Sequence, residues 1–76
     1  MNNDFVKEHL LKAFPRATLV EVSGDGYHYQ ATIVSEDFQN QSAVERQRSV
    51  YAVLMAWIQS GELHALKIIA KTPFEW

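Results

Sequence analysis

The segment between residues 42 and 61 constrains the fold most, because it predicts a long helix flanked by two strand-like runs. Ser42 and Glu45 have the spacing of a capping box, and Gly61 stands where a left-handed C-terminal cap is expected. Between them only Gln47 interrupts a stripe of apolar residues at steps of three and four. A helix of this length can form a right-handed crossover between two parallel strands. The stripe consists of Ala43, Val50, Tyr51, Leu54, Trp57 and Ile58.

The two runs before this helix predict a β-hairpin. Residues 18–23 are rich in β-branched side chains, and the glycine-flanked turn 24–26 follows them. From residue 27 to residue 34 the chain alternates between two kinds of side chain, which is typical of a half-buried strand. One face of that strand would carry Tyr27, Tyr29, Ala31 and Ile33, and the other His28, Gln30 and Thr32.

The remaining elements are expected at the two ends of the chain. A first helix is predicted from Asp4 to Phe14, with Asn3 as its cap and Pro15 as its stop. A third strand is predicted over residues 63–71, with Leu66, Ile68 and Ala70 facing the core. Residues 72–75 repeat the capping-box spacing and predict a short closing turn.

The predicted element order is therefore α-β-β-α-β in a single domain over residues 1–76. We expect a two-layer α+β sandwich in which both helices cover one face of a three-stranded mixed sheet. The connector 35–41 is polar and carries one apolar anchor, Phe38. A chain of 76 residues is close to the lower limit at which a single core holds itself together.

Composition narrows the classes of function. The net charge of -2 argues against a broadly basic nucleic-acid binder, although a local basic patch remains possible. The chain has no cysteine, so its own residues cannot form a disulfide, a zinc ribbon or a catalytic thiol. No signal peptide or membrane-spanning run is visible, and a soluble cytoplasmic protein is the expectation.

Two histidines form the one constellation that suggests chemistry. His28 and His64 each stand at the entrance of a predicted strand, and parallel strands start at the same edge of a sheet, about 5 Å apart. Neutral imidazole is a common metal ligand, but taken alone a histidine at a strand end is more often structural. Asp25 could add a third ligand, although an aspartate between glycines is usually a turn former. A site with two nitrogen donors and no sulfur invites a partner that supplies thiolates, as in iron–sulfur clusters of mixed ligation.

Other candidate sites are weaker. Arg46 and Arg48 could meet phosphates at the start of the long helix, but a solvated helix face is the better interpretation. No phosphate-binding loop and no nucleophile–base arrangement stands out, so an enzyme is not expected. Phe74, Trp76 and Tyr51 could form an aromatic docking patch or complete the core, and for Tyr51 we expect the core.

Four segments together resemble the BolA-like family, and in particular its short bacterial members. They are the hairpin 22–29, the segment 46–51, the strand entrance 63–66 and the closing segment 72–76. The resemblance implies a fold related to the class II KH domain and a partnership with monothiol glutaredoxins around a shared [2Fe-2S] cluster. It implies that His64 is the main ligand and His28 the hairpin ligand, while the glutaredoxin cysteine and glutathione supply sulfur. The expected role is iron–sulfur trafficking or iron and redox regulation.

The resemblance also implies a second role, because BolA-like proteins are described as regulators of transcription and of stress responses. Binding to DNA would then involve Arg46, Arg48, Lys67 and Lys71. The chain lacks the Gly-x-x-Gly loop with which KH domains clamp a nucleic-acid backbone, so this KH-like regulator is the alternative. An adaptor that binds glutaredoxin without a cluster is a third possibility. Alone, the protein is expected to be a monomer or a weak homodimer.

Overall fold

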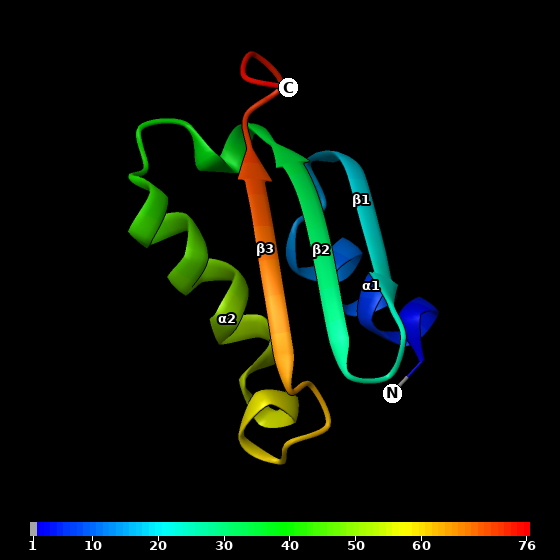
Figure 1. Ribbon diagram of the computed structural model, residues 1–76. Helices are drawn as coiled ribbons and strands as arrows, with labels where there is room; N and C mark the ends of the chain where they lie inside the picture. The colour runs from blue at the N-terminus through cyan, green and yellow to red at the C-terminus, as the bar shows by residue number, and fades with distance from the viewer. Residues whose placement is uncertain (1) are drawn as a thin grey trace.

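The computed structural model describes residues 2–76 and has the predicted element order (Figure 1). Two α-helices, three strands and one short 3-10 helix follow one another along the chain. Their bounds are α1 Asn3–Ala13, β1 Ala17–Gly24, β2 His28–Ser35, η1 Glu36–Phe38, α2 Ala43–Gln59 and β3 Ala65–Lys71. Within these residues no helix is both long and apolar enough to cross a membrane.

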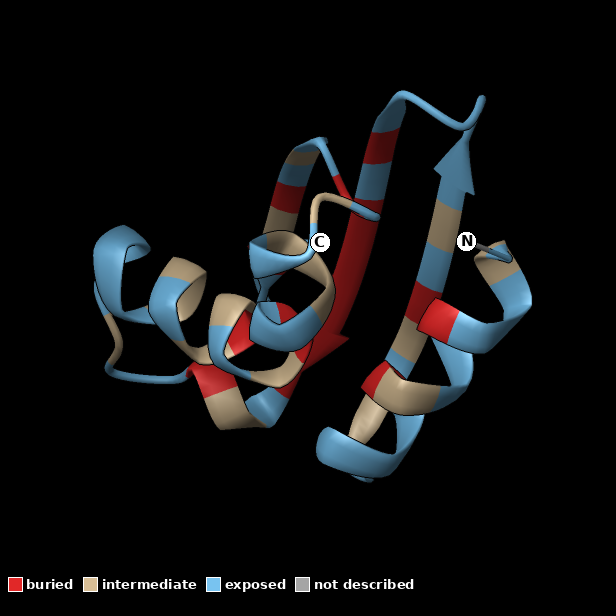
Figure 2. Ribbon diagram, turned by 90° about the horizontal axis from the view of Figure 1, so that it is seen from below, coloured by how far each residue is buried: buried red, intermediate tan, exposed pale blue. Residues whose placement is uncertain are grey.

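The strands form a mixed sheet in the order β1-β2-β3, as the crossover argument predicts. β1 pairs with β2 antiparallel through the hairpin, and β2 pairs with β3 in parallel because α2 carries the chain back between them. Both helices lie on the same face of the sheet, so the predicted two-layer α+β sandwich is confirmed (Figure 2).

The core fills the space between the two layers. Each helix buries residues one turn apart, Val6 and Leu10 from α1 and Val50 and Leu54 from α2. They pack against the helix-facing side chains of the sheet and against Phe38 of η1. The Phe38 ring contacts the Phe14 ring, with 5.4 Å between the ring centroids. The buried sheet residues of this cluster are Val20, Tyr29, Ala31, Ile33, Ile68 and Ala70.

The central strand is more buried than its alternating pattern predicts. All residues from Ala31 to Ser35 are buried, on both faces of the strand, and Val34 is only 1% exposed. In the sheet register Val34 lies between Leu19 of β1 and Lys71 of β3. A strand with neighbours on both edges is thus covered even where no helix lies above it.

The third strand begins at Ala65 and not at residue 63. The predicted cap of α1 and the predicted start of β2 are also wrong, for local reasons. Asn2, not Asn3, caps α1, because its Oδ1 accepts the backbone N–H of Asp4 at 2.7 Å. Tyr27 does not share the buried face of Tyr29 but is 71% exposed, because the turn extends to residue 27 and β2 begins at His28. The capping box of α2 and the positive φ of Gly61 (84°) are as predicted.

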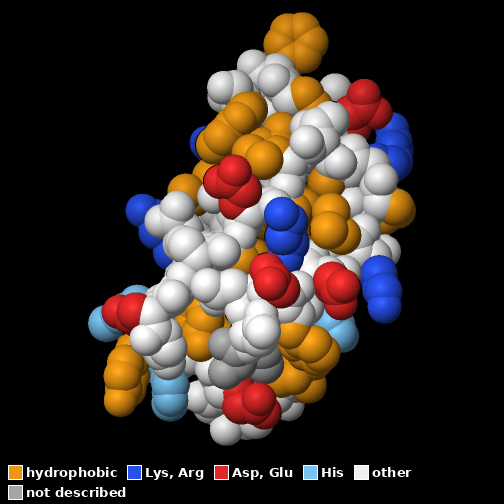
Figure 3. Space-filling view, turned by 90° about the vertical axis from the view of Figure 1, so that its right-hand side faces the viewer, with side chains coloured by type: hydrophobic (Ala, Val, Ile, Leu, Met, Phe, Trp, Pro, Cys, Tyr) orange, Lys and Arg blue, Asp and Glu red, His pale blue; other side chains and the backbone are white. Residues whose placement is uncertain are grey.

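The C-terminal aromatic side chains lie outside the core. Phe74 is 97% and Trp76 65% exposed, whereas Tyr51 packs against the core and its hydroxyl donates to the Leu66 carbonyl at 3.4 Å. In the space-filling view, hydrophobic side chains project at the upper end of the molecule, where the chain ends (Figure 3). The prediction that Tyr51 completes the core is confirmed.

Candidate metal-binding site

The parallel pairing of β2 and β3 brings the two predicted histidines to one edge of the sheet. His28 is the first residue of β2 and lies in register with Ala65, the residue directly after His64. The backbone N–H of Ala65 also donates to the Tyr27 carbonyl at 3.3 Å, so the two segments are joined where the histidines stand. The geometric part of the prediction is therefore confirmed, while ligation of a metal stays a prediction.

Both imidazoles are open to solvent. The His28 side chain is 81% exposed, and His64 is also exposed. Figure 3 shows histidine side chains projecting from the lower end of the molecule, near the strand starts. A partner protein can therefore reach both rings without any rearrangement of the core.

His64 is held by a well-anchored backbone although its ring is exposed. The preceding residue, Leu63, is 2% exposed, and its N–H donates to the Trp57 carbonyl at 3.0 Å. The ring lies beside Gly61, with its Cε1 3.8 Å from the position that a Cβ on that glycine would occupy. The turn that ends α2 therefore lies against the His64 ring.

His28 is held by the hairpin turn. The Asp25 carboxylate accepts the backbone N–H of His28 at 2.8 Å and that of Tyr27 at 2.9 Å, both through Oδ1. The pKa of the Asp25 carboxyl is held below its ordinary value by these hydrogen bonds, of which the one from His28 has the larger effect and the one from Tyr27 the smaller. Of the two interpretations of Asp25, turn former and third ligand, the structure shows the turn former.

The donor set of this edge is limited to two imidazoles. Within residues 2–76 there is no group of three or more histidine, cysteine, aspartate or glutamate side chains that could hold a metal ion. A shallow hollow of about 380 Å³ beside His28 is lined also by Tyr29, Ala65, Leu66 and Lys67. His64 is not part of its lining, so the hollow extends away from the second imidazole along β3.

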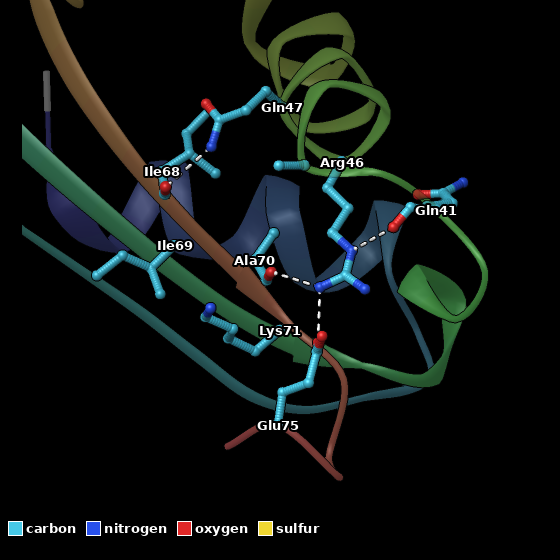
Figure 4. A pocket seen from close by; sticks show the side chains of 9 residues that line it. Gln41, Arg46, Gln47, Ile68, Ile69, Ala70, Lys71 and Glu75 are labelled. Carbon is cyan, nitrogen blue, oxygen red and sulfur yellow. Dashed lines mark hydrogen bonds and ion pairs between the residues drawn. The ribbon is translucent and has the colours of Figure 1, made fainter.

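Arg46 serves the fold, a role that the sequence analysis missed. Its side chain is only 13% exposed, and its guanidinium donates to the Gln41 carbonyl at 3.0 Å, the Ala70 carbonyl at 3.2 Å and Glu75 Oε1 at 2.6 Å (Figure 4). Gln47 acts similarly by donating to the Ile68 carbonyl at 3.0 Å. These α2 side chains, with Tyr51, occupy the outward carbonyls of the edge strand β3 and so block its pairing with another strand.

The other predicted nucleic-acid contacts lie apart from one another. Arg48 is exposed on α2 and is close enough to Glu45 to interact with its charge. Lys67 lies at the hollow beside His28, and Lys71 lines a cleft of about 440 Å³ at the other end of β3. Arg46 lines the same cleft as Lys71, but its guanidinium is already hydrogen-bonded within the fold. The nucleic-acid assignment stays a prediction.

The Arg46–Glu75 pair makes stability depend on pH. Its hydrogen bond from Arg46, and a second from the Thr72 backbone, lower the pKa of Glu75 from 4.5 to about 2. Because the folded state has the lower pKa, this stabilisation is complete above pH 4.5 and is lost as the pH falls towards 2.

We expect thermal melts followed by circular dichroism to show a steeper loss of Tm between pH 4.5 and pH 2 for wild type than for Glu75→Gln. Solvent screening keeps the difference modest, and parallel curves would contradict it.

Comparison with known proteins identifies the family. The sequence model of the family described as BolA, BolA-like protein, matches residues 6–75. The chain therefore belongs to the BolA-like family, as its sequence motifs predict. Within that family it is similar to the acid stress protein IbaG of Escherichia coli strain K12, with 41% identity over 76 residues that cover 100% of this chain and 89% of IbaG.

Solved structures of the same family share the fold. BolA1 from Arabidopsis thaliana matches with a TM-score of 0.87 at 31% identity, covering 100% of this chain and 98% of that chain. The BolA domain of SufE1 from the same plant matches with a TM-score of 0.86 at 35% identity, covering 97% of this chain and 94% of that one. The α-β-β-α-β sandwich is thus the fold of the family.

Proposed function

We propose that this protein docks a monothiol glutaredoxin and contributes His64, assisted by His28, to a [2Fe-2S] cluster that the two proteins share. The observation that carries the proposal is the β2–β3 register, which brings the backbones of two exposed histidines, His28 and His64, to the same end of the sheet. The family resemblance, which implies this partnership, supports the same two residues.

The residues at this edge fit such a cluster. Imidazole nitrogen replaces thiolate on one iron of Rieske-type [2Fe-2S] centres, so two histidines are a chemically reasonable share of the ligands. The chain has no cysteine, and the remaining ligands would be the thiolates of glutaredoxin and glutathione. When bound, the cluster supplies an electron-transfer group and a transferable iron–sulfur unit, while this chain supplies the imidazoles and their orientation.

The two histidines would make unequal contributions. The backbone at His64 is fixed on both sides, by buried Leu63 before it and by β3 after it. His28 depends instead on an exposed turn, where the Asp25 carboxylate holds its backbone. A ligand whose position is set by the core needs less ordering when a partner binds, and this supports His64 as the principal ligand.

The biological role follows from the same site. A cluster held between two chains is accessible to acceptors, which suits iron–sulfur trafficking or sensing of iron and redox state. Because IbaG carries the description acid stress protein, a role in a stress response is part of the proposal.

The test is anaerobic cluster reconstitution of an equimolar mixture of this protein, a monothiol glutaredoxin and glutathione. We expect visible absorption and circular dichroism spectra that differ from those of the glutaredoxin homodimer, together with one heterodimer peak in size-exclusion chromatography. Glutaredoxin reconstituted alone is the control. A mixture that shows only the homodimer spectrum would remove the shared cluster from the proposal.

A further inference from the structure

The hairpin turn contains a carboxylate, that of Asp25, which binds the backbone of Tyr27 and His28 and lies near the His28 ring. Asp25 Oδ1 accepts the backbone N–H groups of Tyr27 and His28, and Asp25 Oδ2 lies 3.8 Å from His28 Nδ1. We propose that Asp25 is a positioning residue that fixes the His28 ring and leaves Nε2 as its ligating nitrogen. The inference rests on the proposed function, because it concerns the second histidine of the same site.

The backbone part of this role is a closed turn. Besides the two bonds to Oδ1, the Asp25 backbone N–H donates to the His28 carbonyl at 3.2 Å. Gly26 has φ of 99°, which a residue with a Cβ adopts only with strain. Gly24 lies under the Tyr29 ring, where an added Cβ would be 2.4 Å from Cδ1. The hydrogen bonds and the two glycines therefore fix the conformation of the turn, and with it the backbone of His28.

The side-chain part of this role concerns the two ring nitrogens. At 3.8 Å, Asp25 Oδ2 is beyond hydrogen-bond distance of Nδ1, but its negative charge favours the tautomer that carries the proton on Nδ1. The lone pair is then on Nε2, on the far side of the ring. Metal-bound histidines usually have such a carboxylate or carbonyl partner at the nitrogen that does not bind the metal, and it fixes both tautomer and ring orientation. With 81% of its side chain exposed, His28 can present Nε2 to a partner.

The two backbone hydrogen bonds that close the turn use only Asp25 Oδ1, whereas Oδ2 is the oxygen near the His28 ring. Both backbone bonds go to Oδ1, which an asparagine also offers, whereas only the ionised carboxylate places a negative charge beside Nδ1. Asp25→Asn therefore separates the two parts of the role, and Asp25→Ala removes both. Glu21→Gln is the matched control, because Glu21 is an exposed carboxylate on β1 outside the turn.

The first experiment uses the protein alone, without metal or partner. Long-range ¹H–¹⁵N spectra of the ¹⁵N-labelled chain at about pH 8 report the His28 tautomer. We expect Nδ1–H to predominate in wild type and in Glu21→Gln, and the population to shift towards Nε2–H in Asp25→Asn. The same tautomer distribution in wild type and Asp25→Asn would overturn the proposal.

The second experiment uses the complex reconstituted with glutaredoxin and glutathione. Loss of an outer carboxylate partner typically costs about 10–100-fold in metal affinity, so we expect a comparably shorter cluster lifetime in Asp25→Asn, read from the decay of visible absorption under a chelator. An unchanged lifetime would overturn the positioning role. A wild-type mixture that forms no shared cluster would instead overturn the proposed function, and the tautomer measured on the free chain keeps the two failures distinguishable.

Discussion

If the proposed cluster is shared with glutaredoxin, replacement of His64 by alanine is expected to abolish its spectrum while leaving the domain folded. The ring is exposed, whereas the neighbouring backbone is held by Leu63 and by β3. Loss of an exposed side chain changes stability by about 0.5 kcal/mol or less, which corresponds to a few degrees in Tm. The measurement is reconstitution followed by visible circular dichroism, with a thermal melt of the same preparation.

Two further histidine variants make this result specific. His28→Ala is expected to weaken the shared cluster without abolishing it, because its backbone is set by an exposed turn. His9→Ala is the control, since His9 lies between Phe5 and Trp57, with ring centroids 4.7 and 4.6 Å away, in the helical layer. It should lower stability modestly and leave the cluster spectrum intact. If His64→Ala unfolded the domain, or kept the wild-type spectrum, His64 would not be the ligand.

The sheet edge was predictable because it depends on topology rather than on detail. A helix from Ser42 to Gly61 between two strands is long enough for a right-handed crossover, which allows the strands to pair in parallel. Parallel strands begin at one edge, so the expected pairing predicts that His28 and His64 lie at the same edge, and the structure has this pairing. The register, with His28 opposite Ala65, refines this neighbourhood without changing it.

The structural role of Arg46 was not predictable in the same way. Its partners are Gln41, Ala70 and Glu75, and the last is 29 residues away in sequence, where no local pattern connects the two charges. Gln47 did carry a signal, as the one polar residue in an apolar helical stripe. A buried polar side chain needs a hydrogen-bond partner, and the edge of the adjacent strand was available as one.

The contacts of Asp25 show a second reason why sequence patterns did not predict every structural detail. Glycine, aspartate and glycine in sequence predict a turn, but not which residue ends it. The bonds from Tyr27 and His28 to Asp25 extend the turn by one residue beyond the alternating pattern, which moves Tyr27 into solvent and makes His28 the first residue of β2. Hydrogen bonds from the backbone to the Asp25 side chain thus determine where the strand begins, even though the alternating sequence pattern extends one residue further.

The largest effect on stability is expected for Phe38→Ala. Phe38 is fully buried at 0% exposure, although the segment around it is polar, and its ring packs against that of Phe14 in the core. Removing a buried phenylalanine costs about 3–5 kcal/mol, because the lost transfer energy adds to that of the cavity left behind. A domain of this size has a total stability of about 4–11 kcal/mol, so the variant should be marginally folded at room temperature.

Chemical denaturation followed by far-ultraviolet circular dichroism measures this loss as a lower midpoint at unchanged slope. Phe74→Ala is the matched control, since it removes the same atoms from a side chain that is 97% exposed, and its midpoint should remain close to wild type. The comparison separates a core anchor from a surface aromatic residue within one short chain. Similar midpoints for the two variants would show that η1 does not lock the connector to the core. The link between β2 and α2, and with it the crossover that aligns the two histidines, would then depend on the helix and the sheet alone.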